Sequence, residues 1–219
     1  MSAPQEPVGG VSDAPRSYRA AWIIAFLMGI TTITLMRPCT RHIPEPPPAV
    51  GAFPEVQLLD ATEAPWGSEQ LEGRVYVVAF LSSRCVVEDG CSGVFSALGE
   101  LQRFFTREKV PIWVVGITID DHWTASSFQH WSEVAWQTLG SVRLLRGSVA
   151  EITAIVQGAR ALQSESTESG LADELGMPWS MGLILVDGEG QCRGFYETTS
   201  DGVDEVRHRA AHVYREKQS

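Results

Sequence analysis

Two cysteines in one short stretch carry the clearest chemical signal in this sequence. Cys85 and Cys91 lie in the run Phe80-Leu-Ser-Ser-Arg-Cys-Val-Val-Glu-Asp-Gly-Cys-Ser. The β-rich run Val75–Leu81 precedes them, and a helical pattern follows. A helix N-terminus stabilises a thiolate through its dipole and its free N–H groups. Two nearby thiols can close a disulfide or share a soft metal ion, so this pair is the candidate site.

The residues between and beside the cysteines favour different states of the thiols. Arg84 favours a thiolate at Cys85 because a nearby positive charge stabilises the charged form, whereas Glu88 and Asp89 oppose it. Gly90 gives the backbone freedom for disulfide closure, which needs Cα atoms about 4.4–6.8 Å apart. Reversible thiol–disulfide exchange and a purely stabilising disulfide in an oxidising compartment both stay open.

The sequence contains four cysteines, and four cysteines allow three full pairings. Cys39 follows a long apolar segment, and Cys192 lies in an expected hairpin. We therefore expect Cys85 to pair with Cys91, and the other two cysteines to be free.

The composition is that of a globular protein with an acidic surface. Of the 219 residues, 44% are hydrophobic and 20% are charged, and the net charge is -10. This length suits one ordinary domain with an extension. The acidic balance argues against nucleic acid as a partner. The chain contains no GxGxxG, P-loop, HExxH or G-x-S-x-G pattern, which argues against nucleotide-binding and hydrolase functions.

The first 50 residues differ in character from the rest. Residues 1–19 are polar and rich in Pro, Gly and Ser, which predicts a disordered tail. Residues 20–36 carry no charge over 17 positions, close to the lower end of the about 17–25 that span a bilayer. We predict a transmembrane anchor there, since no small-x-small site for cleavage of a signal peptide follows. Residues 37–50 form a Pro-rich linker, and the domain covers residues 51–219.

Alternating and helical hydrophobic patterns define the elements of the domain. The expected strands are Val56–Leu58, Val75–Leu81, Pro111–Asp120, Met181–Val186 and Gln191–Tyr196. The expected helices run from Ser92 to about Thr106, from Thr124 to about Val134, from Ser148 to Gln157, and from Gly202 to Glu216. Ser92, Thr124 and Ser148 are the expected N-caps of the first three, and Asp187-Gly-Glu-Gly is the expected turn between the last two strands. Two buried strands joined by a helix imply a parallel crossover, and the last two strands should form an antiparallel hairpin. The predicted class is α/β with a thioredoxin-like fold, a central mixed sheet flanked by helices.

Four stretches of the domain stand out by their order and spacing. They are Phe53-Pro-Glu-Val-Gln-Leu-Leu-Asp, Leu71-Glu-Gly-Arg-Val-Tyr-Val-Val-Ala-Phe-Leu-Ser-Ser-Arg-Cys, Val114-Val-Gly-Ile-Thr-Ile-Asp-Asp and Ser180-Met-Gly-Leu-Ile-Leu-Val-Asp-Gly-Glu-Gly. Together they resemble the Sco/SenC family, the membrane-anchored thioredoxin-like proteins of cytochrome oxidase copper-site assembly. Peroxiredoxins and membrane-tethered thioredoxin-like reductases share some of these pieces. The resemblance implies a domain outside the cytoplasm, anchored in a bacterial-type inner membrane, with a cytochrome oxidase subunit or another thiol protein as partner.

The chain departs from the family pattern in two places. The family has a C-x-x-x-C segment with Pro after each cysteine, whereas here two extra residues intervene and Val86 and Ser92 follow the cysteines. The family's metal-ligand His is replaced by Trp179, whose indole N–H is a donor without a free lone pair. Two thiolates, aided by a thioether of Met177 or Met181, are the copper ligands that stay available.

Three functions follow from the resemblance and these departures. The first is a thiol–disulfide protein, a candidate oxidoreductase, that assists copper-site assembly through Cys85 and Cys91. The second is a Cu(I) metallochaperone that uses the same two cysteines with an altered ligand set. The third is a degenerate module that binds a partner and keeps a structural disulfide.

Other polar residues have simpler interpretations. His208 and His212 have the i, i+4 spacing of metal ligands, but they lie on a helix rich in Arg and Glu, which favours a solvated face. Asp120 and Asp121 stand at the end of a long strand, at the carboxyl edge where α/β proteins place their sites, but a turn or a helix start is the favoured explanation. His122 and His130 are candidates to approach the cysteines, although no spacing requires it.

A group of tryptophans and a polar stretch complete the residues that the sequence singles out. Trp123, Trp131 and Trp136 indicate core packing, with an exposed partner surface as the alternative. Gln163–Gly170 is predicted to be a polar loop. It leads toward the position of the missing His, so a loosened loop there would fit a lost metal site.

Overall fold

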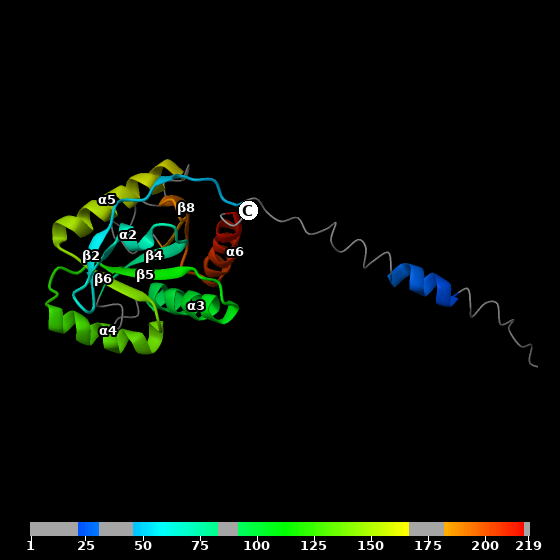
Figure 1. Cartoon of the computed structure of the whole chain (residues 1–219), viewed down its shortest axis with the longest axis horizontal. Helices are drawn as coiled ribbons and strands as arrows, with labels where there is room; N and C mark the ends of the chain where they lie inside the picture. The colour runs from blue at the N-terminus through cyan, green and yellow to red at the C-terminus, as the bar shows by residue number, and fades with distance from the viewer. Residues whose placement is uncertain (1–21, 31–45, 83–91, 167–181, 217–219) are drawn as a thin grey trace, which may run out of the picture. The chain divides into compact units, whose positions relative to one another are not determined.

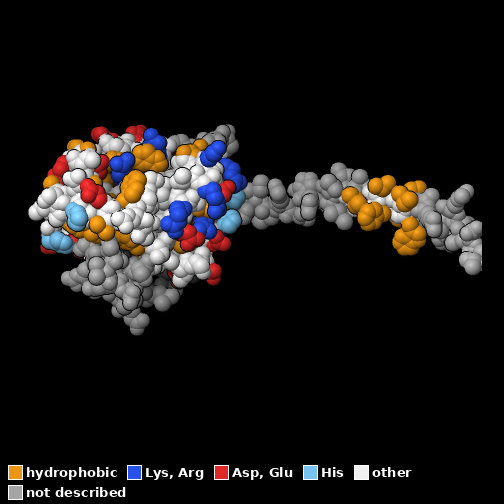
Figure 2. Space-filling model, turned by 90° about the horizontal axis from the view of Figure 1, so that it is seen from below, with side chains coloured by type: hydrophobic (Ala, Val, Ile, Leu, Met, Phe, Trp, Pro, Cys, Tyr) orange, Lys and Arg blue, Asp and Glu red, His pale blue; other side chains and the backbone are white. Residues whose placement is uncertain are grey.

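The computed structural model describes residues 22–30, 46–82, 92–166 and 182–216 (Figure 1). The chain divides into two compact units, Met1–Pro44 and Glu45–Ser219. The first unit contains a helix over residues 22–30, whose side chains are exposed and almost all apolar (Figure 2). Within the described residues, no helix combines the length and the apolar character needed to cross a membrane. The anchor over residues 20–36 stays a prediction.

The second unit is built on one mixed sheet with helices on both faces (Figure 1). Its described strands are β1 (Gly51–Ala52), β2 (Gln57–Asp60), β3 (Pro65–Gly67), β4 (Tyr76–Leu81), β5 (Trp113–Thr118), β6 (Arg143–Arg146), β7 (Leu183–Val186) and β8 (Gln191–Tyr196). Its helices are α2 (Ser68–Leu71), α3 (Ser92–Glu108), α4 (Ala125–Leu139), α5 (Val149–Ser166) and α6 (Ser200–Glu216). The strand order is β1-β8-β7-β4-β5-β6-β2-β3. Strands β4, β5 and β6 are parallel, and the remaining described pairs are antiparallel.

Strand β4 lies inside the sheet and is buried on both faces. Val77, Ala79 and Leu81 pack into a cluster with α3, α4 and α6. The alternate residues, including Val78 and Phe80, pack into a second cluster with α5 and the segment around β2 and β3. None of the strand's side chains is more than 4% exposed. Successive side chains of a strand point to opposite faces of the sheet, and both faces are buried here, so this run is apolar throughout.

The helices present apolar stripes to these two clusters. On α5, Ile152, Ile155, Val156 and Ala159 recur at helical spacing and are buried against one face. Figure 1 shows α5 on one side of the sheet, with α3 and α4 on the other. Helix α4 begins after Thr124, whose hydroxyl accepts from the backbone N–H of Ser127 at 3.2 Å, so the predicted cap is confirmed.

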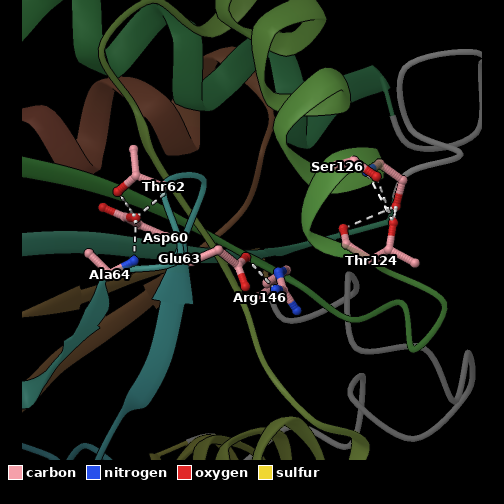
Figure 3. A network of polar contacts seen from close by, with 8 residues as sticks. Asp60, Thr62, Glu63, Ala64, Thr124, Ser126 and Arg146 are labelled. Carbon is pink, nitrogen blue, oxygen red and sulfur yellow. Dashed lines mark hydrogen bonds and ion pairs between the residues drawn. The ribbon is translucent and has the colours of Figure 1, made fainter.

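The antiparallel edge beside β6 is fixed by a polar turn between β2 and β3 (Figure 3). One carboxylate oxygen of Asp60 accepts from the N–H and hydroxyl of Thr62, at 2.8 and 2.6 Å, and from the N–H of Ala64 at 3.2 Å. Burial raises the pKa of Asp60, but these hydrogen bonds and Arg143 outweigh it and hold the pKa below its ordinary value. The ionised Asp60 carboxylate therefore stabilises the fold at pH values above its ordinary pKa. This stabilisation is lost as the pH falls through the lower pKa of the folded state.

Most predicted elements of the domain are confirmed, but the sequence missed β1, β3, β6 and α2 and ended two helices too early. Helix α4 continues to Leu139, beyond the predicted end near Val134. The segment Arg143–Arg146 forms β6, a strand that the sequence did not predict. Helix α5 continues to Ser166, so the predicted end at Gln157 is wrong. Of the predicted loop Gln163–Gly170, residues 163–166 are helical, and residues 167–170 lie outside the described part.

An ion pair between Asp187 and Arg193, near the β7–β8 turn, fixes residues at the beginning of the domain. Asp187, 4% exposed, accepts from the N–H groups of Glu189 and Gln191 at 2.8 and 2.9 Å. Nε of Arg193 donates to its other carboxylate oxygen at 2.6 Å, and Arg193 also donates to the carbonyl of Pro47 at 2.8 Å. Residues 46–50, which the sequence assigns to the linker, therefore include residues bonded to the sheet.

Candidate functional site

The cysteine segment joins the buried centre of the sheet to a long helix. Strand β4 ends at Leu81, and α3 begins at Ser92. Cys85 and Cys91 belong to residues 83–91 and lie outside the described part, as do Trp179, Met177 and Met181. What the structure describes is the frame around them: the ends of β4 and β5, and the first turns of α3 and α4.

The carboxyl ends of β4 and β5 are joined by backbone and side-chain hydrogen bonds. The N–H of Ile119 donates to the carbonyl of Leu81 at 2.8 Å. One residue further, the hydroxyl of Ser82 donates to Oδ1 of Asp120 at 3.0 Å. Ser82 is only 5% exposed, so this bond satisfies a buried hydroxyl. Asp120 thus fixes the residue that leads into the cysteine segment, a role that the sequence did not predict.

The first turn of α3 is held close to the link between β8 and α6. A Cβ atom added to Gly93 would lie 3.2 Å from Oγ1 of Thr198, so the backbone at Gly93 approaches this link closely. Val94 and Phe95 are each 5% exposed and belong to the core cluster beneath α3. The predicted N-cap, Ser92, is itself the first residue of the helix. The cysteine segment therefore leads into a helix whose first turn is packed against the core.

An aromatic cluster lies beyond the end of β5. The ring of Trp123 lies 5.2 Å from that of Trp131 and 5.4 Å from that of Phe128, centroid to centroid. Phe95 of α3 contacts Trp131 edge-on at 6.1 Å. Core packing, as predicted, explains these two tryptophans. Trp136 differs, since it is 59% exposed on α4.

The histidines do not form a metal site with other described residues. His122 stacks against Trp123 at 4.8 Å, and His130 is exposed on α4. Nδ1 of His208 lies 2.7 Å from the carbonyl of Asp204 in its own helix. Burial lowers the pKa of His212, and nearby arginines lower it further. In the described ranges, no group of three or more His, Cys, Asp or Glu side chains is placed to hold a metal ion.

The fourth cysteine of the chain is a buried thiol. Cys192 on β8 is free and 0% exposed, as expected for a residue outside the pair; Cys39 lies outside the described residues. Burial raises the pKa of the Cys192 thiol to about 11, and the nearby Asp187 carboxylate contributes to this rise. Cys192 is therefore a packing residue of the core and not a nucleophile.

A comparison with models of protein families shows to which family this chain belongs. The SCO1/SenC family model matches residues 45–214, which is more than half of the chain and includes the whole sheet. The chain belongs to the SCO1/SenC family. A comparison with curated proteins gave no match.

Solved structures of SCO1/SenC proteins share the fold at low sequence identity. One is BsSco, described as a member of the Sco family of cytochrome c oxidase assembly proteins with a disulfide switch. It is 14% identical, with a TM-score of 0.61 over 78% of this chain and 98% of that one. A SCO1/SenC family lipoprotein from Bacillus anthracis is 16% identical, with a TM-score of 0.57 over 74% and 95%. Copper-bound yeast Sco1 is 19% identical, with a TM-score of 0.52 over 73% and 90%. The predicted thioredoxin-like fold is thereby confirmed.

The raised pKa of Cys192 predicts that this thiol resists alkylation in the folded SCO1/SenC domain. At pH 8 only about one Cys192 thiol in a thousand is ionised, and only the thiolate reacts. In a variant with the other three cysteines replaced by serine, labelling by a maleimide should be at least ~100-fold slower in the native protein than in denaturant. Mass spectrometry over time measures both rates. Equal rates in the two states would contradict the burial of this thiol.

Proposed function

We propose that this chain is a thiol–disulfide protein that assists assembly of the copper site of a cytochrome oxidase through Cys85 and Cys91. The observation that carries the proposal is the family match over residues 45–214, which includes both cysteines. BsSco, which has the same fold, is described as having a disulfide switch. In this chain the two cysteines lie in sequence between the end of β4 and the start of α3.

The proposed chemistry is a two-electron exchange. One thiolate of the pair attacks a sulfur of the partner's disulfide, a mixed disulfide forms, and the partner's other sulfur leaves as a thiolate and takes up a proton. The second cysteine then attacks the mixed disulfide and releases the partner's remaining thiol. The partner gains two electrons and two protons, and Cys85–Cys91 becomes the disulfide.

The described frame supports this exchange by fixing both ends of the cysteine segment. The Ser82–Asp120 hydrogen bond holds the residue after β4, and the packing of Val94 and Phe95 holds the start of α3. The dipole of α3, a helix of 17 residues, favours a thiolate near its N-terminus. Glu88 and Asp89 oppose ionisation within the same segment. We therefore infer a moderate activation of the nucleophile and a slow exchange with small thiols.

A redox titration separates an exchanging pair from a structural disulfide. The full chain is equilibrated in glutathione buffers and its thiols are counted by alkylation. An exchanging Cys85–Cys91 pair should titrate as a two-electron couple between about -180 and -270 mV. Cys192→Ser should leave this transition unchanged, whereas Cys85→Ser should abolish it. A pair that stays oxidised to below about -300 mV is a structural disulfide and contradicts the proposal.

Copper delivery is the second candidate, and copper-bound yeast Sco1, which has the same fold, favours it. In this chain the donors would be the thiolates of Cys85 and Cys91, with a thioether of Met177 or Met181, because sulfur ligands suit Cu(I). Trp179 stands where the family has its ligand His, which removes one nitrogen donor. We infer weaker retention of copper than a Cys–Cys–His set provides.

Anaerobic loading with Cu(I) followed by desalting tests this second candidate. The wild-type chain should retain about one equivalent if two thiolates suffice, and Cys85→Ser should lose it. Cys192→Ser is the matched control, since its thiol is buried in the core. Trp179→His, which restores an imidazole, should raise retention further. Equal copper contents in the wild type and Cys85→Ser would rule out a site at these cysteines.

We further propose that the domain is held at a membrane on its extracytoplasmic side. The apolar, exposed helix over residues 22–30 supports an anchor in the first unit, and the Bacillus anthracis relative is described as a lipoprotein. An oxidising compartment also suits disulfide chemistry.

Protease accessibility tests this placement. Protease added to intact spheroplasts should digest the domain, while a cytoplasmic marker protein stays whole. Protection of the domain until the cells are lysed would contradict the proposed side.

A further inference from the structure

A groove between α4 and the β2–β3 turn, called here the α4 groove, carries an exposed tryptophan. Its volume is about 340 Å³. Two residues of the turn and four of the helix line it: Ala61, Thr62, Gln129, Ser132, Glu133 and Trp136. The four helical residues follow the spacing i, i+3, i+4 and i+7, so they form one stripe along α4. The helix buries a different stripe, which contains Phe128, Ala135 and Leu139, so α4 has a packed face and an open face.

Trp136 has no structural role in the described part of the second unit. Its side chain is 59% exposed, and it belongs to neither core cluster, whereas Trp123 and Trp131 both pack against one of them. Among the described residues, its ring contacts no other aromatic ring and no Arg or Lys. Exposed aromatic rings are enriched where proteins bind one another, because they bury a large apolar area there.

Arginine side chains cover other tryptophan rings of this unit. The guanidinium carbon of Arg74 lies 4.4 Å from the ring centroid of Trp113. That of Arg143 lies 5.8 Å from the ring centroid of Trp66. The ring of Trp136 is open to the same cation–π contact, but the described chain supplies no cation for it. An arginine from outside the chain is therefore the occupant that matches this ring.

A carboxylate lies next to the open ring. Glu133 is exposed three positions before Trp136, so the two side chains are neighbours on the helix surface. One oxygen of Glu133 accepts from Nε2 of Gln129 at 3.3 Å, and within the described ranges Glu133 forms no ion pair. No Lys or Arg is among the residues that line the groove. A guanidinium is planar, so it can stack its face on an indole ring while its edge donates to a carboxylate.

The wall opposite to α4 is fixed before any partner binds. The N–H and hydroxyl of Thr62 donate to Oδ1 of Asp60 at 2.8 and 2.6 Å (Figure 3). Ala61, the other residue of this wall, packs against a core cluster. A preformed groove lowers the free-energy cost of ordering its residues on binding.

We propose that the α4 groove binds an arginine side chain of a protein partner, with the guanidinium stacked on Trp136 and its N–H groups donated to Glu133. The net charge of the chain is -10, which attracts a basic partner and repels a second copy. This assignment does not rest on the chemistry of Cys85 and Cys91.

Saturation-transfer NMR of the full-length chain with the peptide acetyl-Gly-Leu-Arg-Leu-Gly-amide tests the cation. The arginine protons should receive saturation from the protein. Replacing the arginine of the peptide by citrulline, which keeps the shape without the charge, should raise the dissociation constant by about fivefold or more. The lysine peptide should bind more weakly than the arginine peptide, because an ammonium lacks the planar face. A citrulline or lysine peptide that binds as tightly as the arginine peptide would overturn the proposal.

Variants of the lining test the two contacts. Trp136→Ala should weaken binding of the arginine peptide by about fivefold or more. Its melting temperature should change by less than about 2 °C, since the ring lies outside both core clusters. Glu133→Gln should weaken binding by about threefold or more. Glu205→Gln makes the same change of charge on α6, which does not line the groove, and should change affinity by less than about 1.5-fold.

Two results with these variants contradict the assigned contacts. Unchanged affinity in Trp136→Ala would show that the ring does not hold the guanidinium. Equal weakening by Glu133→Gln and Glu205→Gln would show diffuse attraction to an acidic protein.

Sedimentation of the full-length chain tests a second copy as the competing occupant. The wild type and Trp136→Ala should have the same oligomeric state. A wild-type dimer that dissociates in Trp136→Ala would assign the α4 groove to a second copy and overturn the proposal.

Discussion

The burial of β4 on both faces is the constraint on which the rest of the structure depends. Its six side chains alternate between two core clusters. Strand β5 pairs with β4 along its whole length, and β7 pairs with its first half, Tyr76–Val78. A strand buried in this way cannot shift by one residue without exchanging its two faces, so its register is fixed. The residues that follow Leu81 must therefore leave the sheet at one defined point beside the end of β5. The proposed chemistry of Cys85 and Cys91 relies on this exit point, which Ser82 and Asp120 hold by a hydrogen bond.

The centre of the fold could be predicted because its signals are local and strong. The apolar runs that became β4, β5 and β7, the turn at Asp187 and the Thr124 cap each specify their own conformation. Strand β6 was missed because it has only two buried residues, Leu144 and Leu145, between two arginines. Its strand character comes from pairing with β5 and β2, which is tertiary information. Helix α5 was predicted too short for a related reason, because its last turns are polar and carry little periodic signal.

The candidate site was only partly predictable for a different reason. The types and positions of Cys85 and Cys91 point to thiol chemistry, which stays a prediction, and the family match covers both positions. The supporting residues gave no comparable signal. Ser82 and Asp120 are 38 positions apart and meet only because β4 and β5 are parallel and in register. From the sequence alone, a turn or a helix start is the favoured role of Asp120.

The burial that fixes β4 also separates the thiols of this chain by their chemistry. Cys192 lies in the core, where burial raises its pKa to about 11, so it stays a neutral thiol. A neutral, enclosed thiol cannot compete with Cys85 and Cys91 for a partner's disulfide or for Cu(I). A change that Cys85→Ser causes in redox titration or in copper content can therefore be assigned to the cysteine segment and not to the core.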